Sequence, residues 1–187
     1  VMDQNTRDEL LKLFQNKLSD AMRFYLETCT RCGMCTEACH VYASMGQVRY
    51  IAAYRAEIVR RLYKKYFKGR GKFWPSVGEA KELTEMAVEE LFDAAYSCTG
   101  CRRCMVYCPF GIDTQMIMSI AKLLLIGAKA EPEILSMLAD TSVEKGKSVA
   151  LFKEGFLEGI KRLEEEVVAK WKSDAGETPI PVDKEGA

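Results

Sequence analysis

All eight cysteines of the chain lie in two stretches, Cys29-Thr-Arg-Cys32-Gly-Met-Cys35-Thr-Glu-Ala-Cys39 and Cys98-Thr-Gly-Cys101-Arg-Arg-Cys104-Met-Val-Tyr-Cys108-Pro109. Both stretches have the spacing C-x2-C-x2-C-x3-C. Thiolates at steps of three residues let one loop bind three irons of a 4Fe-4S cubane, while the fourth iron takes its ligand from elsewhere. The spacing therefore predicts two 4Fe-4S clusters.

The fourth cysteine of each motif is predicted to bind the other motif's cluster, as in two-cluster ferredoxins. By this rule cluster A takes Cys29, Cys32, Cys35 and Cys108, and cluster B takes Cys98, Cys101, Cys104 and Cys39. Crossed ligation would join the two halves of the chain and bring the clusters close enough for electron tunnelling. The alternative is two structural zinc sites with four thiolates each, which also use C-x2-C pairs but do not need the third cysteine.

Length and composition describe a chain that can fold around a core. It has 187 residues, of which 48% are hydrophobic, and its 27 basic residues equal its 27 acidic ones. The balanced charge gives no reason to expect nucleic acid as a partner.

The start, Val1 to Leu10, lacks the basic flank and apolar run of a secretory signal. The longest apolar stretch, Ile117 to Ala128, contains Lys122 and is shorter than the roughly 20 residues that cross a bilayer. We therefore expect a cytoplasmic protein, or one held at the cytoplasmic face of a membrane through a partner.

Outside the motifs, apolar residues recur at helical spacing and no segment alternates as a strand would. The pattern predicts one long helix over 6–27, a second over 48–67 with Ile51, Tyr54, Ile58 and Leu62 on its apolar face, and a third over 83–94. Asp113 is placed to cap a helix that Gly127 and Pro132 end. A last helix, from about 148 to 172, is expected to bury Phe152, Phe156, Ile160, Leu163 and Trp171.

The fold class is thus predicted to be all-α, with pseudo-twofold halves that each consist of a helix, a cysteine motif and another helix. Residues 1–172 are expected to form this two-cluster domain, and residues 173–187 an extended tail or linker. The helix over 48–67 would carry a basic face, formed by Arg60, Arg61, Lys64, Lys65 and Lys68. A solvated face and a docking site for an acidic partner or anionic lipid both fit this pattern.

A few other residues near the motifs are candidates for tuning the clusters. His40 follows Cys39 where the second motif has Pro109, and it is placed either to hydrogen-bond a cluster sulfur or to lie in solvent without a redox role. Arg31, Arg102 and Arg103 lie inside the loops, where positive charge would favour a reduced cluster. The chain has no nucleotide-binding or nucleophile-elbow motif and no cysteine left over. We therefore predict no catalytic residue and no turnover by this chain alone.

The two motifs, separated by helices, resemble the helical dicluster ferredoxin domain found in the C-type subunit of heterodisulfide reductase. Residues 29–40 and 98–113 are most similar to the amino-terminal part of the heterodisulfide-reductase-like K-type subunit of the dissimilatory sulfite reduction membrane complex. The resemblance covers most of the chain. In such relatives the dicluster region precedes a cysteine-rich catalytic domain, and 180–187 looks like the run into it.

The resemblance implies electron transfer in sulfur metabolism. Single electrons would pass from a membrane cytochrome b-type subunit, a flavoprotein or a ferredoxin to a catalytic thiol-disulfide domain or subunit. A rival within the same class is the iron-sulfur subunit of a quinone-linked succinate, glycerol-3-phosphate or glycolate dehydrogenase. A rival from another class is a zinc-stabilised interaction module.

Overall fold

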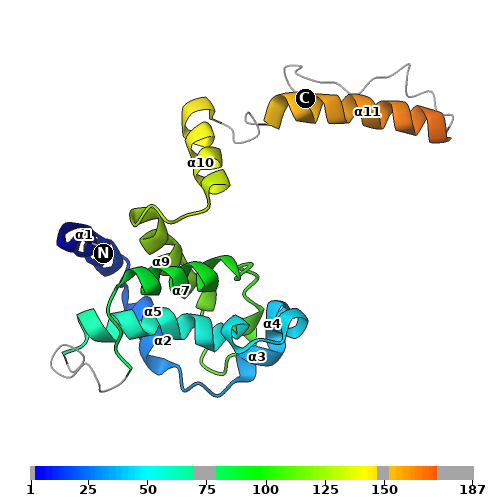
Figure 1. Cartoon of the computed structure of the whole chain (residues 1–187). Coiled ribbons are helices and arrows are strands. Elements are labelled where there is room, and N and C mark those ends of the chain that lie inside the picture. The colour runs from blue at the N-terminus through cyan, green and yellow to red at the C-terminus, as the bar shows by residue number, and fades with distance from the viewer. Residues whose placement is uncertain (1–2, 70–78, 147–151, 172–187) are drawn as a thin grey trace. The chain divides into compact units, whose positions relative to one another are not determined.

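The computed structural model describes residues 3–69, 79–146 and 152–171, and every regular element in these ranges is helical (Figure 1). The predicted all-α class is confirmed. The chain divides into two compact units, Val1–Glu131 and Pro132–Ala187. The first unit contains both cysteine motifs and is described first.

Two helices, and not one, precede the first motif. They are α1 (Gln4–Asn16) and α2 (Asp20–Thr28), so the prediction of a single helix over 6–27 is wrong. The break lies at Ser19, whose hydroxyl accepts a hydrogen bond of 3.2 Å from the Met22 N–H and so caps α2. A serine side chain that competes for backbone donors favours a helix start over a helix interior.

The first motif continues into a series of helices that leads to the longest helix of the unit. Short helices α3 (Met34–Ala38) and α4 (His40–Met45) are followed by a 3-10 turn, η1 (Val48–Tyr50), and by α5 (Ala52–Phe67). The helix predicted from 48 therefore begins at 52, after a tighter turn.

The buried face of α5 differs from the predicted one. Tyr54, expected in the core, is 41% exposed, whereas Arg60, expected on a solvated basic face, is only 3% exposed. Arg60 is accommodated because its Nε donates to the Leu26 carbonyl at 2.7 Å and its Nη1 bonds the carboxylate of Glu57. Buried charges are tolerated only when they are paired in this way.

The second half repeats the order of helix, motif and helix with α7 (Glu85–Tyr96), α8 (Arg103–Val106) and α9 (Thr114–Gly127). The predicted cap of α9 is confirmed, since the Asp113 carboxylate accepts from the N–H groups of Gln115 and Met116 at 3.0 and 3.2 Å. A capping carboxylate satisfies donors that have no partner inside the helix. Asp113 thus fixes the point at which the chain leaves the second motif.

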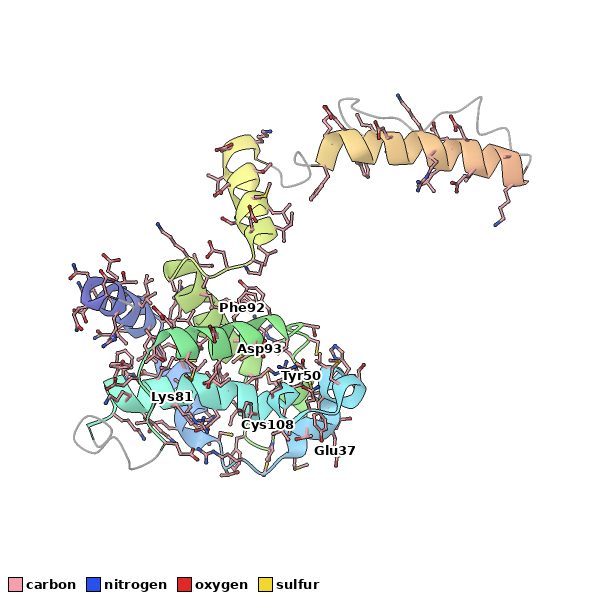
Figure 2. All side chains as sticks on the ribbon, viewed as in Figure 1. Glu37, Tyr50, Lys81, Phe92, Asp93 and Cys108 are labelled. Carbon is pink, nitrogen blue, oxygen red and sulfur yellow. The ribbon has the colours of Figure 1, made fainter. Side chains whose placement is uncertain are left out.

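The core lies between α5, α7 and α9, which pack against one another, while α1 and α2 cover α9. Figures 1 and 2 show α5 and α7 running alongside each other, with their side chains filling the space between them. The largest fully buried side chains come from all of these helices: Leu10, Phe14, Leu26, Leu62, Leu91, Ile117, Ile120, Leu124 and Leu125. The helices that flank both motif loops thus share one core.

The second unit contains α10 (Glu133–Lys145) and α11 (Lys153–Trp171). The sequence did not predict α10. The predicted burial is wrong for Phe152, Phe156 and Leu163, which are at least half exposed, whereas Ile160 is partly buried and the side chain of Trp171 lies outside the described part of the chain. Helical spacing shows which side of a helix is apolar but not what covers it. The predicted tail, 173–187, lies outside the described residues.

Candidate iron–sulfur site

The two cysteine loops adopt the same unusual backbone conformation. In the first loop Arg31 (φ 57°) and Gly33 (φ 83°) are left-handed, and in the second loop Gly100 (φ 71°) and Arg102 (φ 59°) are left-handed. Each pair flanks the second cysteine of its motif. Successive turns of this kind direct backbone N–H groups into a concave surface that suits an anion. The left-handed conformation costs most L-residues free energy. Arg31 adopts it at the position where the second loop has Gly100, and Arg102 adopts it where the first loop has Gly33.

The loops lead into short helices that contact each other. Gly33 and Arg102 are the residues just before α3 and α8, and these two helices pack together. Cys35 and Cys104 lie on them. Burial raises the pKa of both thiols, and the proximity of Cys104 raises the pKa of Cys35 further. The two motifs are therefore neighbours in the fold.

One cavity brings together cysteines from both motifs. Its wall contains Cys39 from the first motif and Cys98, Cys101 and Cys104 from the second. Cys39 is 8% exposed, whereas Cys101 faces solvent. These four residues are the set predicted for cluster B.

The set predicted for cluster A is more open. Cys32 is exposed, and Cys29 lines a separate pocket together with basic side chains, among them Arg31, Lys64 and Lys68. Cys108, labelled in Figure 2, is partly buried against the hydrophobic core.

A buried arginine beside the cavity, Arg55, indicates that the cavity suits an anionic cluster. Arg55 is 3% exposed, and its Nη2 lies 3.0 Å from the Cys39 sulfur while its Nη1 donates to the Ser97 carbonyl at 2.8 Å. Its Nε has no hydrogen-bond partner, and among the described residues no carboxylate forms an ion pair with it. A buried cation needs a counter-charge. The thiolates and a 4Fe-4S cluster would supply one.

The spacing of the cysteines favours a cluster over single metal ions. Within the part of the chain that the structure describes, no three His, Cys, Asp or Glu side chains converge as they would around one ion. A zinc site gathers its thiolates at about 2.3 Å from one centre. In a cubane each thiolate binds its own iron, so the sulfurs stand further apart.

The loop residues singled out by the sequence make contacts of their own. The exposed His40 lies against the second loop, with Nε2 3.4 Å from the Thr99 hydroxyl and Nδ1 3.9 Å from the Cys101 sulfur. The Arg102 guanidinium binds the Asp113 carboxylate at 3.0 Å. A hydrogen bond from the Arg103 N–H lowers the pKa of the Cys101 thiol, which favours the thiolate that iron requires. The role of His40 toward a cluster stays a prediction.

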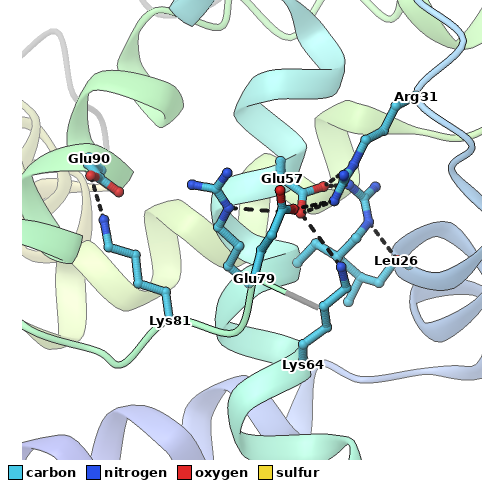
Figure 3. Close-up of polar contacts among 9 residues, drawn as sticks. Leu26, Arg31, Glu57, Lys64, Glu79, Lys81 and Glu90 are labelled. Atoms are coloured by element: carbon cyan, nitrogen blue, oxygen red, sulfur yellow. Dashed lines mark hydrogen bonds and ion pairs between the residues drawn. The ribbon is translucent and has the colours of Figure 1, made fainter. Parts of the chain in front are cut away.

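The first loop is tied to α5 through one buried carboxylate, that of Glu57 (Figure 3). Arg31 binds it through two hydrogen bonds of 2.6 and 3.1 Å, and Arg60 binds it from one turn further along α5. Arg31 donates a third hydrogen bond, of 2.6 Å, to the carboxylate of Glu79. Burial raises the pKa of Glu57, but the hydrogen bond from Arg31 and the charge of Arg60 outweigh that effect and hold the pKa below its usual value.

Sequence reasoning did not single out Arg55 or Glu57. The signal for Arg55 was present, since it lies at helical spacing from Ala52, Ala56 and Val59, all of which are buried. A charge on an apolar stripe marks either a paired core residue or a residue directed at a cofactor. Arg55 bonds both the Ser97 carbonyl and the sulfur of Cys39, a predicted cluster ligand.

A comparison with protein families matches residues 25–112 to the 4Fe-4S dicluster domain. This range contains both motifs and the helices between them. Residues 25–112 form a 4Fe-4S dicluster domain. The dicluster domain binds two 4Fe-4S clusters and transfers electrons, as the cysteine spacing predicted.

The chain is similar to heterodisulfide-reductase-like proteins. The chain is 30% identical over 168 residues to the Hdr-like menaquinol oxidoreductase iron-sulfur subunit 2 of Archaeoglobus fulgidus, a match that covers 89% of the chain and 30% of that relative. It is 37% identical over 92 residues to the D-type subunit of the dihydromethanophenazine:CoB--CoM heterodisulfide reductase of Methanosarcina acetivorans, which covers 48% of the chain and 21% of the relative. The predicted kinship is confirmed.

The chain matches only a part of each of these relatives. It spans less than a third of the length of the Archaeoglobus fulgidus relative. These relatives favour a heterodisulfide-reductase-like protein over a quinone-linked dehydrogenase subunit or a zinc module. No solved structure matches the chain. None of the helices among the described residues is long and apolar enough to cross a bilayer.

Proposed function

We propose that the dicluster domain relays single electrons through two clusters held by crossed ligation. Cluster A is bound by Cys29, Cys32, Cys35 and Cys108, and cluster B by Cys98, Cys101, Cys104 and Cys39. The observation that carries this proposal is the cavity that Cys39 shares with the first three cysteines of the second motif. Each cluster, when bound, takes up and gives back one electron at a time.

The protein supplies position and charge for this relay. Contact between α3 and α8 holds Cys35 and Cys104 close to each other, which keeps the two clusters adjacent. The Arg31–Glu57 bonds fix the first loop to α5, and the Asp113 cap fixes the end of the second loop to α9. Because both loops are attached to one core, little rearrangement accompanies electron transfer.

Paired cysteine substitutions test the crossed ligation. With both clusters loaded anaerobically, the chain is expected to contain about eight irons. The double variant Cys39→Ala/Cys98→Ala removes two ligands of cluster B alone and should retain about four irons. Its matched control, Cys39→Ala/Cys29→Ala, removes one ligand from each cluster and should retain almost none.

The reverse pattern of iron contents would show that each motif binds its own cluster. Electron paramagnetic resonance of the dithionite-reduced protein provides the second readout. Two adjacent reduced clusters couple magnetically, and the Cys39→Ala/Cys98→Ala variant should give an uncoupled spectrum from cluster A. Stoichiometric zinc in place of iron would contradict both the ligation and the relay.

We further propose that the relay connects a quinol-linked membrane partner with a thiol-disulfide site. The names of the relatives support both the quinol-linked donor and the thiol-disulfide acceptor. One relative is a menaquinol oxidoreductase subunit, and another belongs to a heterodisulfide reductase. Reduction of one disulfide to two thiols consumes two electrons and two protons, so the domain would deliver its electrons in two steps. The cytoplasmic location predicted from the sequence is part of this proposal.

The test of the partners uses the complex isolated anaerobically from native membranes. A reduced menaquinol analogue should generate the cluster signal, and an added organic heterodisulfide should then abolish it. Failure of the quinol to reduce the clusters, with dithionite still effective, would argue for a flavoprotein or ferredoxin donor. Succinate or glycolate as an effective reductant would instead support the quinone-linked dehydrogenase alternative.

A further inference from the structure

The side chain of Arg55, in α5, donates a hydrogen bond to a cysteine sulfur, that of Cys39, whereas the hydrogen bond from α5 to Cys35 comes from the backbone N–H of Ala53. The Nη2 of Arg55 donates to Cys39 at 3.0 Å, and the Cys39 sulfur itself lies 3.5 Å from the Tyr50 carbonyl. Both side chains are more than nine-tenths buried. The guanidinium therefore places a buried positive charge in contact with a predicted cluster ligand.

We propose that Arg55 supplies the counter-charge for cluster B and sets its reduction potential above that of cluster A. The inference rests on the proposed crossed ligation, which makes Cys39 a ligand of cluster B. Reduction adds one negative charge to a cluster that four thiolates have already made anionic. A buried cation that donates a hydrogen bond to a ligand sulfur stabilises the more negative state, and hydrogen bonds to sulfur and local charge both raise such potentials.

The corresponding position in the second half carries no charge. The first long helix after each motif, α5 or α9, carries at its fourth position Arg55 in the first half and Ile117 in the second. Ile117 is completely buried and apolar, and Cys108 packs against the same hydrophobic core. The long helices of the two halves therefore differ in charge at this position. The basic side chains that line the pocket of Cys29, namely Arg31, Arg60, Lys64 and Lys68, are all paired with Glu57 or Glu27.

The charge of Arg55 is screened less than that of the loop arginines because Arg55 is buried. The loop arginines Arg31 and Arg102 have side chains that are 47% and 57% exposed, and each is paired with a carboxylate. Water and the carboxylates screen their charge. Arg55 has neither solvent nor a carboxylate partner within the described residues, so its field acts on the Cys39 sulfur almost unscreened.

The consequence is a downhill step from cluster A to cluster B. One electron leaves cluster A, which is oxidised, and enters cluster B, which is reduced. No bond forms or breaks, and no proton is needed because Arg55 is already charged. Electrons would then collect next to the exposed Cys101, where His40 also lies.

Redox titrations of position 55 variants, followed by electron paramagnetic resonance, test the inference. Arg55→Gln removes the charge and keeps an N–H donor, whereas Arg55→Lys keeps the charge. We expect both variants to hold the wild-type iron content. In Arg55→Gln the ratio of reduced to oxidised cluster B at a fixed potential should fall at least tenfold, which is about 59 mV for a one-electron couple. Arg55→Lys should stay close to the wild type.

The matched control is Arg49→Gln, which removes a charge from a half-exposed side chain that is paired with Asp93 at 3.0 Å. It should leave both midpoints unchanged. The shifted midpoint must also be the one that disappears in the Cys39→Ala variant, which assigns it to cluster B. Unchanged midpoints in a fully loaded Arg55→Gln variant would overturn the inference.

Arg55→Gln could also lose the iron of cluster B, and the Arg55→Lys variant then shows whether charge or structure is the cause. If Arg55→Gln cannot hold cluster B but Arg55→Lys holds it at the wild-type midpoint, the position supplies counter-charge as proposed. If both variants lose cluster B, the arginine has a structural role and the inference is overturned. Failure of the proposed ligation would be recognised independently, in the iron contents of the paired cysteine variants, where Arg55 is unchanged.

Discussion

The guanidinium of Arg31 binds the carboxylate of Glu57 through two hydrogen bonds, from Nη2 at 2.6 Å and from Nε at 3.1 Å. Arg31 lies in the first cysteine loop, and Glu57 lies 26 residues later in the middle of α5. The geometry is bidentate, the arrangement in which an arginine restrains a carboxylate most strongly. The pair therefore attaches a cluster-binding loop directly to the core.

Glu57→Gln should destabilise the fold strongly. The Glu57 side chain is 7% exposed and that of its partner Arg60 is 4% exposed, so the substitution leaves a buried cation without its counter-charge. Removal of one partner of a buried pair costs about 3–5 kcal/mol. The measurement is anaerobic urea denaturation of the loaded protein. The control, Asp93→Asn, breaks an exposed pair with Arg49 and should cost at most about 1 kcal/mol. Equal losses in the two variants would contradict a buried role for Glu57.

The same carboxylate should make stability depend on acid pH. The pKa of Glu57 in the folded protein lies below its usual value of 4.5, which is close to that of the unfolded chain. Its stabilising contribution is therefore complete above about pH 4.5 and is lost as the pH falls through the lower folded-state pKa. Wild-type and Glu57→Gln urea midpoints should converge as the pH is lowered from 7 toward 3. A gap that stays constant over this range would contradict the assignment.

The cysteine motifs predicted the cofactor because their spacing is imposed by the shape of a cubane. That constraint is local, so the sequence displays it directly, and Asp113 as a helix cap was predictable for the same reason. The break at Ser19 was missed because serine is tolerated both at helix starts and, less favourably, within helices. The sequence thus predicted features that depend on a few neighbouring residues, such as the cysteine motifs and the Asp113 cap.

The burial of Arg55, Glu57 and Arg60 was not predictable in the same way. Apart from the pairing of Arg60 with Glu57 inside α5, their partners are Cys39, Arg31 and the Leu26 carbonyl, which lie outside this helix. A helical periodicity shows which residues share a face, but the charge state of that face depends on what the rest of the chain brings to it. The sequence therefore placed Arg60 on the solvated side of the helix and overlooked Arg55.

Gly33→Ala should weaken the first loop through backbone strain alone. Gly33 has a φ of 83°, and an added Cβ would meet only the Thr36 Oγ1, at 4.0 Å. The left-handed conformation costs an L-residue about 1–2 kcal/mol, and we expect a loss of this size in the same denaturation experiment. Gly33→Asn is the control and should lose less, because asparagine adopts this region more readily. Alanine and asparagine variants of equal stability would show that φ at this position is not limiting.

Gly127→Ala should destabilise the contact between α1 and α9 although alanine is the better helix former. The sequence marked Gly127 as a helix end, but an added Cβ would lie 2.6 Å from Leu10 Cδ2 and 2.9 Å from Leu13 Cδ1. Leu10 is 1% exposed and has little room to move. Overpacking of this kind costs about 1–3 kcal/mol, against a gain in helix propensity of up to about 1 kcal/mol. A double-mutant cycle tests the cause, with Leu10 and Leu13 both replaced by alanine in the reference background, because removal of both sets of clashing methyl groups should abolish the penalty of Gly127→Ala. A penalty that persists in the Leu10→Ala/Leu13→Ala background would place the strain in the backbone of α9 and not in its packing against α1.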